Sequence, residues 1–258
     1  MYSRMALPEA PTFRVDGKRA LVTGGGRGIG LAAATALANA GAHVTLLART
    51  LDEIEASAAA ICERGGEAQA LALDICDLNA VAEAVRNSEA FDILVNNAGT
   101  NRPAALVDMS VAEFDFVMNL NVRAAYFVTQ AVVRRLIETD RPGSIINISS
   151  QMAFVGGVGR TVYCASKAAI EGLTRAMAIE LGPRRIRINS LCPTVTETPL
   201  MESILAEETF RANALSRIAL GRLGQVEDLM GAIVFLASDA SIMMTGSSLI
   251  VDGGWTAG

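Results

Sequence analysis

The sequence predicts an α/β fold in which a doubly wound parallel sheet forms a single domain. Short aliphatic or β-branched runs alternate along the chain with longer helical patterns. The runs are apolar on both sides, as strands are when helices cover both faces of a sheet. No internal repeat, low-complexity tract or Pro/Ser-rich linker marks a second domain.

The order of the elements follows from these runs and patterns. The predicted strands are 19–23, 43–47, 68–73, 91–96, 144–149, 185–191 and 247–252. The predicted helices are 28–40, 51–64, 77–89, 110–139, 161–182 and 226–237. We expect residues 1–14 to form an N-terminal arm and residues 15–258 to form the domain. Within it, a small lid of loop and short helices is expected at about 193–225, which contains Pro193 and Pro199.

Composition excludes several classes of protein. The chain has 258 residues, of which 51% are hydrophobic and 19% are charged, and this rules out intrinsic disorder. The net charge of −5 argues against a nucleic-acid or anionic-lipid partner. The longest apolar stretch, 31–48, is interrupted by polar residues and glycine. We therefore expect no membrane segment, because each half is shorter than the roughly 20 residues that a spanning helix needs.

The four cysteines form no CxxC pair, and the single histidine, His43, cannot complete a Cys/His cluster. We therefore expect no metal site and a reduced, cytoplasmic chain.

A glycine-rich turn follows the first predicted strand, in the run Thr23-Gly24-Gly25-Gly26-Arg27-Gly28-Ile29-Gly30. Glycines permit positive φ and let backbone N–H groups approach a pyrophosphate, which the positive end of the next helix also favours. The GxGxxG/A pattern is met at Gly28, Gly30 and Ala33, in a loop longer than the common fingerprint. The alternative is a tight strand–helix connection without a ligand.

The tip of the second predicted strand bears on the choice of dinucleotide. A free ribose 2′-hydroxyl is normally held there by a carboxylate, whereas a 2′-phosphate needs a cation. The strand ends at Arg49 without an acid, and Arg27 can point to the same phosphate. NADP(H) is therefore preferred, while the nearby Asp52 keeps NAD(H) open.

Tyr163 and Lys167 are spaced i, i+4 at the start of a predicted helix, so their side chains share one face. A tyrosine needs its pKa lowered by about three units, or roughly 4 kcal/mol, to act as a base at neutral pH. One ammonium at about 4 Å supplies about 4 kcal/mol at an effective dielectric of 20. Ser150 follows the fifth predicted strand, at the edge where open α/β sheets bind ligands. By itself, the Tyr/Lys spacing also fits a packed tyrosine beside a surface lysine.

Together these motifs resemble the short-chain dehydrogenase/reductase family, in its single-domain branch. The glycine turn, Asn96-Asn97-Ala98-Gly99, Ser150 and Tyr163-xxx-Lys167 occur in the family's order and spacing. The resemblance extends from about residue 13 to Trp255. It implies a Rossmann-type sheet of seven strands and a reversible hydride transfer between NAD(P)(H) and an alcohol/carbonyl pair.

The resemblance also assigns roles in catalysis. Tyr163 matches the acid/base, Ser150 the residue that hydrogen-bonds the substrate oxygen, and Lys167 the lysine that binds the nicotinamide ribose and lowers the pKa of the tyrosine. Asn121 completes the tetrad by holding a water that relays protons to Lys167. Asn119 is the other candidate for this position. If Asn121 is the tetrad member, Asn119 is expected to be a helix-capping or packing amide.

Further positions match the family's cofactor site. Asp74 matches the acid that contacts adenine. Pro193-Thr194 stands where the family usually has Pro-Gly, so this chain departs from the family pattern there. Thr198 matches the threonine that contacts the carboxamide. The full set of expected cofactor-binding residues is Gly24, Gly26, Arg27, Gly28, Ile29, Gly30, Arg49, Asp74, Ile75, Asn97, Ala98, Gly99, Tyr163, Lys167, Pro193, Thr194, Thr196 and Thr198.

The substrate pocket is expected around Gln151, Met152 and Phe154, the stretch from Gly156 to Tyr163, and segment 197–217. It is mostly apolar, with Arg160 and Glu197 as polar groups besides Gln151. The whole chain resembles the group that contains 3-oxoacyl reductases and sugar-acid dehydrogenases such as gluconate 5-dehydrogenase. A small-molecule carbonyl or alcohol is the expected substrate.

Helix 119–137 is apolar on more than one face, and in the family this helix and the Tyr163 helix pack in a homotetramer. Two other functions remain open at this point: a catalytically silent dinucleotide-binding sensor or scaffold, and another Rossmann enzyme such as a methyltransferase or epimerase.

Overall fold

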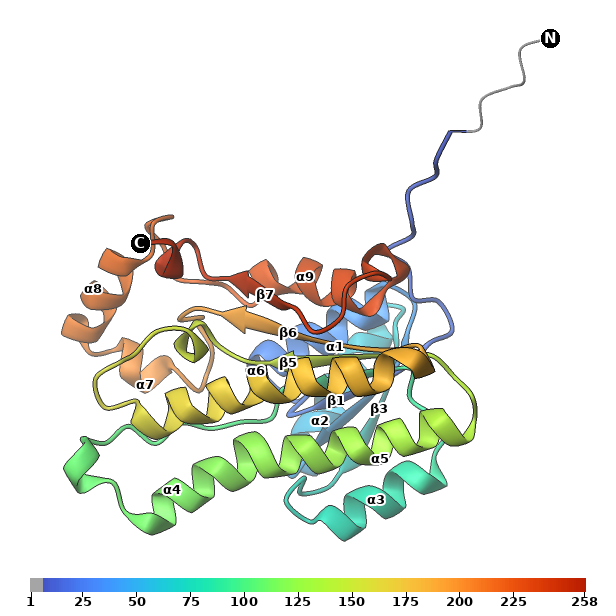
Figure 1. Cartoon of the computed structure of the whole chain (residues 1–258), viewed down its shortest axis with the longest axis horizontal. Helices are drawn as coiled ribbons and strands as arrows, with labels where there is room; N and C mark the ends of the chain where they lie inside the picture. The colour runs from blue at the N-terminus through green and yellow to red at the C-terminus, as the bar shows by residue number, and fades with distance from the viewer. Residues whose placement is uncertain (1–6) are drawn as a thin grey trace.

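A seven-stranded parallel sheet lies between two layers of helices in the computed structural model, which describes residues 7–258 (Figure 1). The strand order is β3-β2-β1-β4-β5-β6-β7, and every neighbouring pair is parallel. This order confirms the predicted single-domain, doubly wound Rossmann-type sheet. The chain reverses its winding direction between β1 and β4, which is where sheets of this kind leave a crevice.

The observed strands lie within three residues of the predicted ones. They are β1 (Arg19–Thr23), β2 (His43–Ala48), β3 (Glu67–Ala72), β4 (Ile93–Asn96), β5 (Gly143–Ile148), β6 (Ile186–Pro193) and β7 (Ser248–Val251). The α-helices are α1 (Gly28–Asn39), α2 (Leu51–Glu63), α3 (Leu78–Asn87), α4 (Val111–Met118), α5 (Ala125–Glu138), α6 (Thr161–Leu181), α7 (Glu202–Leu205), α8 (Glu208–Arg217) and α9 (Glu227–Ala237).

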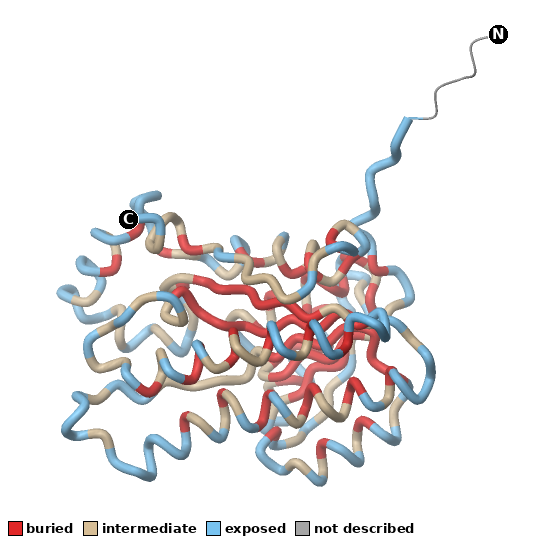
Figure 2. The backbone as a smooth tube through the Cα atoms, in the orientation of Figure 1, coloured by how far each residue is buried: buried red, intermediate tan, exposed pale blue. Residues whose placement is uncertain are grey.

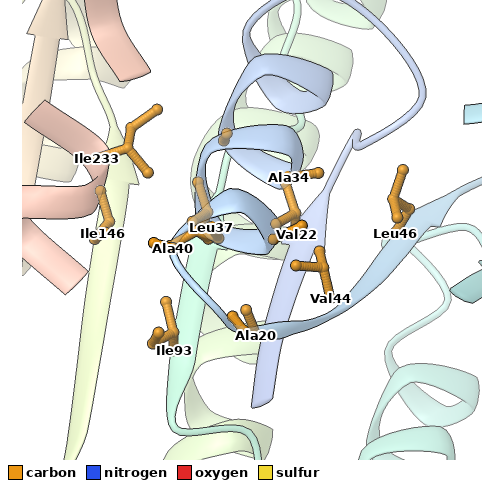
Figure 3. Packing of buried hydrophobic residues seen from close by; sticks show 14 of the residues in the cluster. Ala20, Val22, Ala34, Leu37, Ala40, Val44, Leu46, Ile93, Ile146 and Ile233 are labelled. Carbon is orange, nitrogen blue, oxygen red and sulfur yellow. The ribbon is translucent and has the colours of Figure 1, made fainter. Parts of the chain in front are cut away.

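Two apolar clusters hold the helices on the sheet. Helices α1, α2 and α9 cover one face, where Val22, Leu37 and Ile233 belong to one buried cluster (Figure 3). Helices α3, α5 and α6 cover the other face through residues such as Val85, Val132 and Leu181. The central strands are buried along nearly their whole length (Figure 2), which explains why they read as unbroken apolar runs.

The single helix predicted over 110–139 is wrong in one detail. Between α4 and α5 the chain forms a π-helical segment, Asn119–Ala124. The wider π turn adds one residue but does not interrupt the helix. The spacing of apolar residues therefore does not show where the π turn lies. Such π segments often occur at functional sites.

Segment 193–225 contains two short helices, α7 and α8. A small buried cluster around Ala214, Ile218 and Leu223 anchors it to the domain. Within the predicted arm, residues 7–14 have no regular secondary structure, and the ring of Phe13 lies 6.2 Å from that of Phe235. Residues 1–6 of the arm lie outside the described residues. Across the described chain, none of the helices has the length and hydropathy that crossing a membrane requires.

Candidate active site

A cavity of about 950 Å³ opens at the carboxyl ends of the strands. Its lining runs continuously from the glycine turn after β1, past the ends of β2 to β6, to Ser150 and Tyr163. The cavity thus lies at the crevice beside β1 and β4. The predicted cofactor and catalytic residues line it, except Gly30 and Asn121, which do not.

The conformation of the glycine turn lets other groups come close to its backbone. Gly24 and Gly28 have φ of +64° and +55°, a region that residues with a side chain rarely adopt. A Cβ on Gly30 would lie 2.0 Å from the Gly24 carbonyl oxygen, so only glycine fits there. Gly26, Arg27 and Ile29 complete this wall of the cavity. A turn of this shape, ahead of the N-terminus of α1, suits the diphosphate of a dinucleotide.

Charged side chains surround the turn at the ends of β1 and β2. The Nε of Arg27 lies 3.8 Å from a carboxylate oxygen of Glu53, and Arg49 is exposed on the cavity wall. The sequence suggested Asp52 as the competing acid at this position, but Glu53 lines the cavity and Asp52 does not. The first turn of α2 orients Glu53 toward Gly26, where a Cβ would lie 2.7 Å from its carboxylate.

The loops after β3 and β4 form the next part of the wall. The Asp74 carboxylate accepts a 2.9 Å hydrogen bond from the backbone N–H of Cys76, and Ile75 lies between them. The Asn97 side-chain amide donates to the Thr23 and Gly24 carbonyls at 3.0 and 3.1 Å. This ties the end of β4 to the glycine turn and places Ala98 and Gly99 on the cavity wall.

Ser150, Tyr163 and Lys167 meet at the inner end of the cavity. Ser150 follows β5, donates to the Gln151 side-chain oxygen at 2.7 Å and accepts from the Met152 N–H at 3.1 Å. One turn of α6 separates Tyr163 from Lys167, whose Nζ lies 5.6 Å from the centroid of the tyrosine ring. The Lys167 Nζ also donates to the Ile148 carbonyl at 2.8 Å, which fixes the buried ammonium against the end of β5.

The pKa of Tyr163 is shifted in the direction opposite to our expectation. Burial raises it, and a hydrogen bond with Ser150 and the charge of Arg160 oppose that rise. Burial also lowers the pKa of Lys167 to about 8, although Cys192 and Glu171 act in the other direction. The Tyr163 hydroxyl is therefore protonated at neutral pH and can donate both a hydrogen bond and a proton.

Asn121 is held within the π-helical segment by three hydrogen bonds. Its side-chain amide donates to the Thr100 carbonyl at 2.9 Å and to the Ser166 hydroxyl at 3.1 Å, and its oxygen accepts from the Thr100 N–H at 2.8 Å. Ser166 in turn donates to the Tyr163 carbonyl at 2.7 Å. Asn119 is exposed on the cavity wall and is not buried as a packing amide would be.

The segment after β6 closes the cavity from the other side. Pro193 is the last residue of β6, and the Thr194 N–H donates to the Val251 carbonyl of β7 at 3.3 Å. The Thr194 hydroxyl is buried on the cavity wall without a hydrogen-bond partner in the described chain. Thr196 donates to the Thr194 carbonyl at 3.0 Å, and Thr198 faces Gly28 across the cavity mouth. An unpartnered hydroxyl at this place fits a polar group of a bound dinucleotide.

The substrate end of the cavity differs in part from expectation. Gln151, Met152 and Arg160 line it, but Phe154 and Glu197 do not. Glu197 is held outside the cavity because its carboxylate accepts from Gln225 at 2.5 Å and pairs with Arg211. Phe210, Asn213 and Arg217, which lie within the predicted segment 197–217, line this end, and so do two residues that sequence reasoning did not identify, Asn101 and Trp255. Asn101 follows β4 and Trp255 lies near the C-terminus, so no local sequence pattern connects either of them with α8.

Comparison with known proteins places the chain among enzymes. Residues 24–256 match a family described as enoyl-(acyl carrier protein) reductase. The chain is 40% identical to D-erythrulose reductase of Gallus gallus, over 95% of this chain and 98% of that protein. It is also 40% identical to gluconate 5-dehydrogenase of Gluconobacter oxydans, over 95% of this chain and 96% of that protein. A 3-oxoacyl-[acyl-carrier-protein] reductase of Thermotoga maritima is 39% identical over 94% and 99% of the two chains.

Solved structures agree with these relatives. A gluconate 5-dehydrogenase from Burkholderia cenocepacia, in complex with NADP and tartrate, superposes with a TM-score of 0.91 at 36% identity, covering 95% of this chain and 98% of that chain. A short-chain type dehydrogenase/reductase from Mycobacterium marinum superposes with a TM-score of 0.90 at 37% identity and the same coverage. The similarity therefore covers nearly all of the fold that forms the cavity.

Proposed function

Because this chain belongs to the short-chain dehydrogenase/reductase family and is an oxidoreductase of alcohol and carbonyl groups, we propose that it transfers a hydride between NADP(H) and a carbonyl or secondary alcohol. The observation that carries this proposal is the position of Ser150, Tyr163 and Lys167 on one cavity that continues to the glycine turn.

The proposed catalytic tetrad is Asn121, Ser150, Tyr163 and Lys167. Ser150 and Tyr163 hydrogen-bond the substrate oxygen, and in the reducing direction the Tyr163 hydroxyl gives up its proton as that oxygen gains negative charge. The Lys167 ammonium stabilises the resulting phenolate, since it lies beside the ring in a buried environment. Asn121 holds the Thr100 loop in place and connects through Ser166 to the Tyr163 turn of α6.

A dinucleotide, when bound, supplies or accepts the hydride. The glycine turn would hold its diphosphate, while Asp74, Ile75 and the Asn97–Gly99 loop would hold the adenosine. Lys167 would bind the nicotinamide ribose, and the nicotinamide would lie against Pro193, Thr194, Thr196 and Thr198. Apart from Thr23, Gly25 and Gly30 of the glycine turn, all of these residues line one cavity.

NADP(H) is the preferred cofactor in this proposal. Arg27 and Arg49 can bind a 2′-phosphate, and guanidinium groups suit phosphate geometry. Glu53 lies close enough to Arg27 to neutralise part of that charge, so NAD(H) remains the competing cofactor. The NADP in the related Burkholderia structure supports the preference.

We also propose that segment 193–225 acts as a lid and that the protein is a cytoplasmic homotetramer. The outer faces of α4, α5 and α6 carry exposed apolar side chains, among them Phe114, Tyr126 and Ile179. Exposed apolar patches of this kind mark subunit contacts. All four cysteines are free, as is usual in a reducing compartment.

The proposal is tested by fluorescence titration with NADPH and NADH, followed by turnover assays on a panel of carbonyls and alcohols. NADPH should bind more tightly than NADH, and Arg49→Met should weaken NADPH binding much more than NADH binding. Glu53→Gln should strengthen the preference for NADPH, because it removes the carboxylate that opposes a phosphate. Tight dinucleotide binding without turnover on the whole panel would instead favour the silent sensor.

A further inference from the structure

The substrate end of the cavity contains two arginines that have no acidic partner. Arg160 precedes α6, and its guanidinium lies 5.8 Å from the centroid of the Phe210 ring. Arg217 ends α8, and its guanidinium lies 5.6 Å from the centroid of the Trp255 ring. Among residues 7–258, no carboxylate oxygen lies within the 4.0 Å ion-pair distance of either group. Both cations are thus held against aromatic rings at the cavity wall.

The acids of the cavity lie at its other end. Within the described chain, the carboxylates that line it are Glu53, beside the glycine turn, and Asp74, after β3. No acid faces the substrate end, where Arg160 and Arg217 add to the charge of Lys167. An uncompensated positive charge in a partly buried cleft attracts anions, because low-dielectric walls focus its field.

Burial makes this arrangement costly unless an anion enters. Arg160 is partly buried, and loss of solvation lowers its pKa, while the neighbouring Tyr163 and Cys164 oppose that change. A buried charge is normally paired, since an unpaired one loses its hydration without compensation. No carboxylate of the described residues pairs with Arg160, so its charge lacks a compensating partner.

We propose that the substrate carries a carboxylate and that Arg160 binds it, with Arg217 as a second cation toward the lid. This inference rests on the proposed oxidoreductase function and specifies its substrate class. Arg160 precedes Tyr163 by three residues, so the two side chains project from neighbouring positions at the start of α6. The carboxylate would therefore lie a few bonds from the carbon that exchanges the hydride.

A second group at this end indicates that the acid is hydroxylated. The Asn101 side-chain oxygen is buried at the cavity wall without a hydrogen-bond partner among residues 7–258. Its loop lies beside the one that precedes Arg160, because the Ala104 N–H donates to the Gly159 carbonyl at 3.2 Å. An unpaired acceptor on the same cavity wall as Arg160 suits a substrate hydroxyl next to a carboxylate. The structure therefore favours small hydroxy acids and their oxo forms.

Matched substrate pairs test this inference. The wild type and the variants are assayed by steady-state kinetics with NADP⁺ on D-gluconate against D-sorbitol, and on tartrate against erythritol. Each pair keeps the number of carbons and changes the charge. The wild type should favour at least one acid over its neutral partner, and the KM for that acid should rise with ionic strength because salt screens the attraction.

Arg160→Met should raise the KM of the acid by about 10- to 100-fold, which corresponds to the loss of a charge-assisted hydrogen bond. Because the Arg160 charge also opposes the rise of the Tyr163 pKa, any fall in kcat should be equal for the acid and its neutral partner. The KM of the neutral partner should change by less than about threefold, and Arg160→Lys should restore part of the loss. Arg211→Met is the matched control, because Arg211 lies on the same lid helix as Arg217 but does not line the cavity. NADPH affinity should be unchanged in all of these variants.

Three results would overturn the inference. If Arg160→Met and Phe210→Leu impair acid and neutral substrates equally, Arg160 only holds α8 in place by stacking. If the wild type turns over neutral alcohols and rejects every acid, the substrate class is wrong while the oxidoreductase function stands. If neither acids nor neutral alcohols and carbonyls react with either dinucleotide, the proposed function fails together with the inference.

Discussion

Tyr163 is a buried phenol whose pKa is raised above its usual value, and this determines which direction of the reaction it favours. Its neutral hydroxyl is available as a proton donor at physiological pH, as carbonyl reduction requires. Alcohol oxidation requires the deprotonated form, which the same burial disfavours. At the scale of single residues, the site thus favours reduction at neutral pH.

Replacing Tyr163 by phenylalanine tests its role directly. Tyr163→Phe removes the proton donor but keeps the ring beside Lys167, so turnover should fall by about 10² to 10⁴-fold, as is typical for lost acid/base catalysis. NADPH affinity, measured by fluorescence titration, should stay within about threefold of the wild type. Turnover close to that of the wild type would remove Tyr163 from the proposed tetrad.

The pH dependence of the two directions should differ. Lys167 is charged below its pKa of about 8 and neutral above it, so reductive kcat/KM should be constant at lower pH and fall as pH rises through about 8. Oxidative kcat/KM should have its optimum at higher pH, because it needs the Tyr163 phenolate. Profiles in both directions from pH 6 to 10 measure this.

Lys167→Arg is the control for that profile, since a guanidinium stays charged over the whole range. Any activity that this variant retains should lack the fall near pH 8. An unchanged fall would assign the titration to another group.

Helix α6 is the element that joins the chemistry to the fold. One turn beyond Lys167, the buried Glu171 carboxylate accepts hydrogen bonds from Ser190 at 2.8 Å, from Ser248, and from the Cys192 thiol at 3.4 Å. Burial raises the pKa of Cys192 to about 12, so the thiol stays neutral and can donate. These bonds connect α6 to β6 and β7 and hold its register on the sheet.

Removing this connection should destabilise the protein. Glu171→Ala leaves buried hydroxyl groups without their acceptor, and we expect the free energy of unfolding to fall by about 1–3 kcal/mol. Glu180→Ala on the exposed end of α6 is the matched control and should change it by no more than about 0.5 kcal/mol. Urea denaturation measures both, and equal effects would show that Glu171 does not anchor the helix.

Among the structural elements, those features that depend on local periodicity could be predicted from the sequence. The apolar runs gave the strands within a few residues, and the i, i+4 spacing placed Tyr163 and Lys167 on one face of α6. Glu53 was missed because its position at the glycine turn depends on how α2 packs against β2 and β3. The π-helical segment at Asn119–Ala124 was missed because an added residue does not change composition or apolar content. The direction of the Tyr163 pKa shift depends on burial, which spacing alone does not show.

The whole molecule combines a net negative charge with a cationic cavity. The chain carries a net charge of −5, yet arginine and lysine outnumber acids on the cavity wall: Arg27, Arg49, Arg160, Lys167 and Arg217 face it, against Glu53 and Asp74. The cavity is therefore suited to anionic molecules, and a dinucleotide and a hydroxy acid both belong to that class.

Assembly is the other property of the whole molecule. We expect light scattering at micromolar concentration to show a tetramer. Ile179 on α6 is 82% exposed in the single chain, and Ile179→Glu should shift the protein toward smaller species by placing a charge in an apolar contact. A monomeric wild type would contradict the proposed assembly, and the exposed side chains of α4 to α6 would then need another partner.

Transfer of an isotopic label tests the central claim most directly. The wild-type protein is incubated with NADPH deuterated at C4 of the nicotinamide, on both faces, and with the oxo form of each hydroxy acid and neutral alcohol of the panel. Mass spectrometry should find one deuterium bound to the carbinol carbon of at least one product, and Tyr163→Phe should lower the rate of its appearance by about 10² to 10⁴-fold. Absence of deuterium from every product, in a protein that binds NADPH, would contradict hydride transfer.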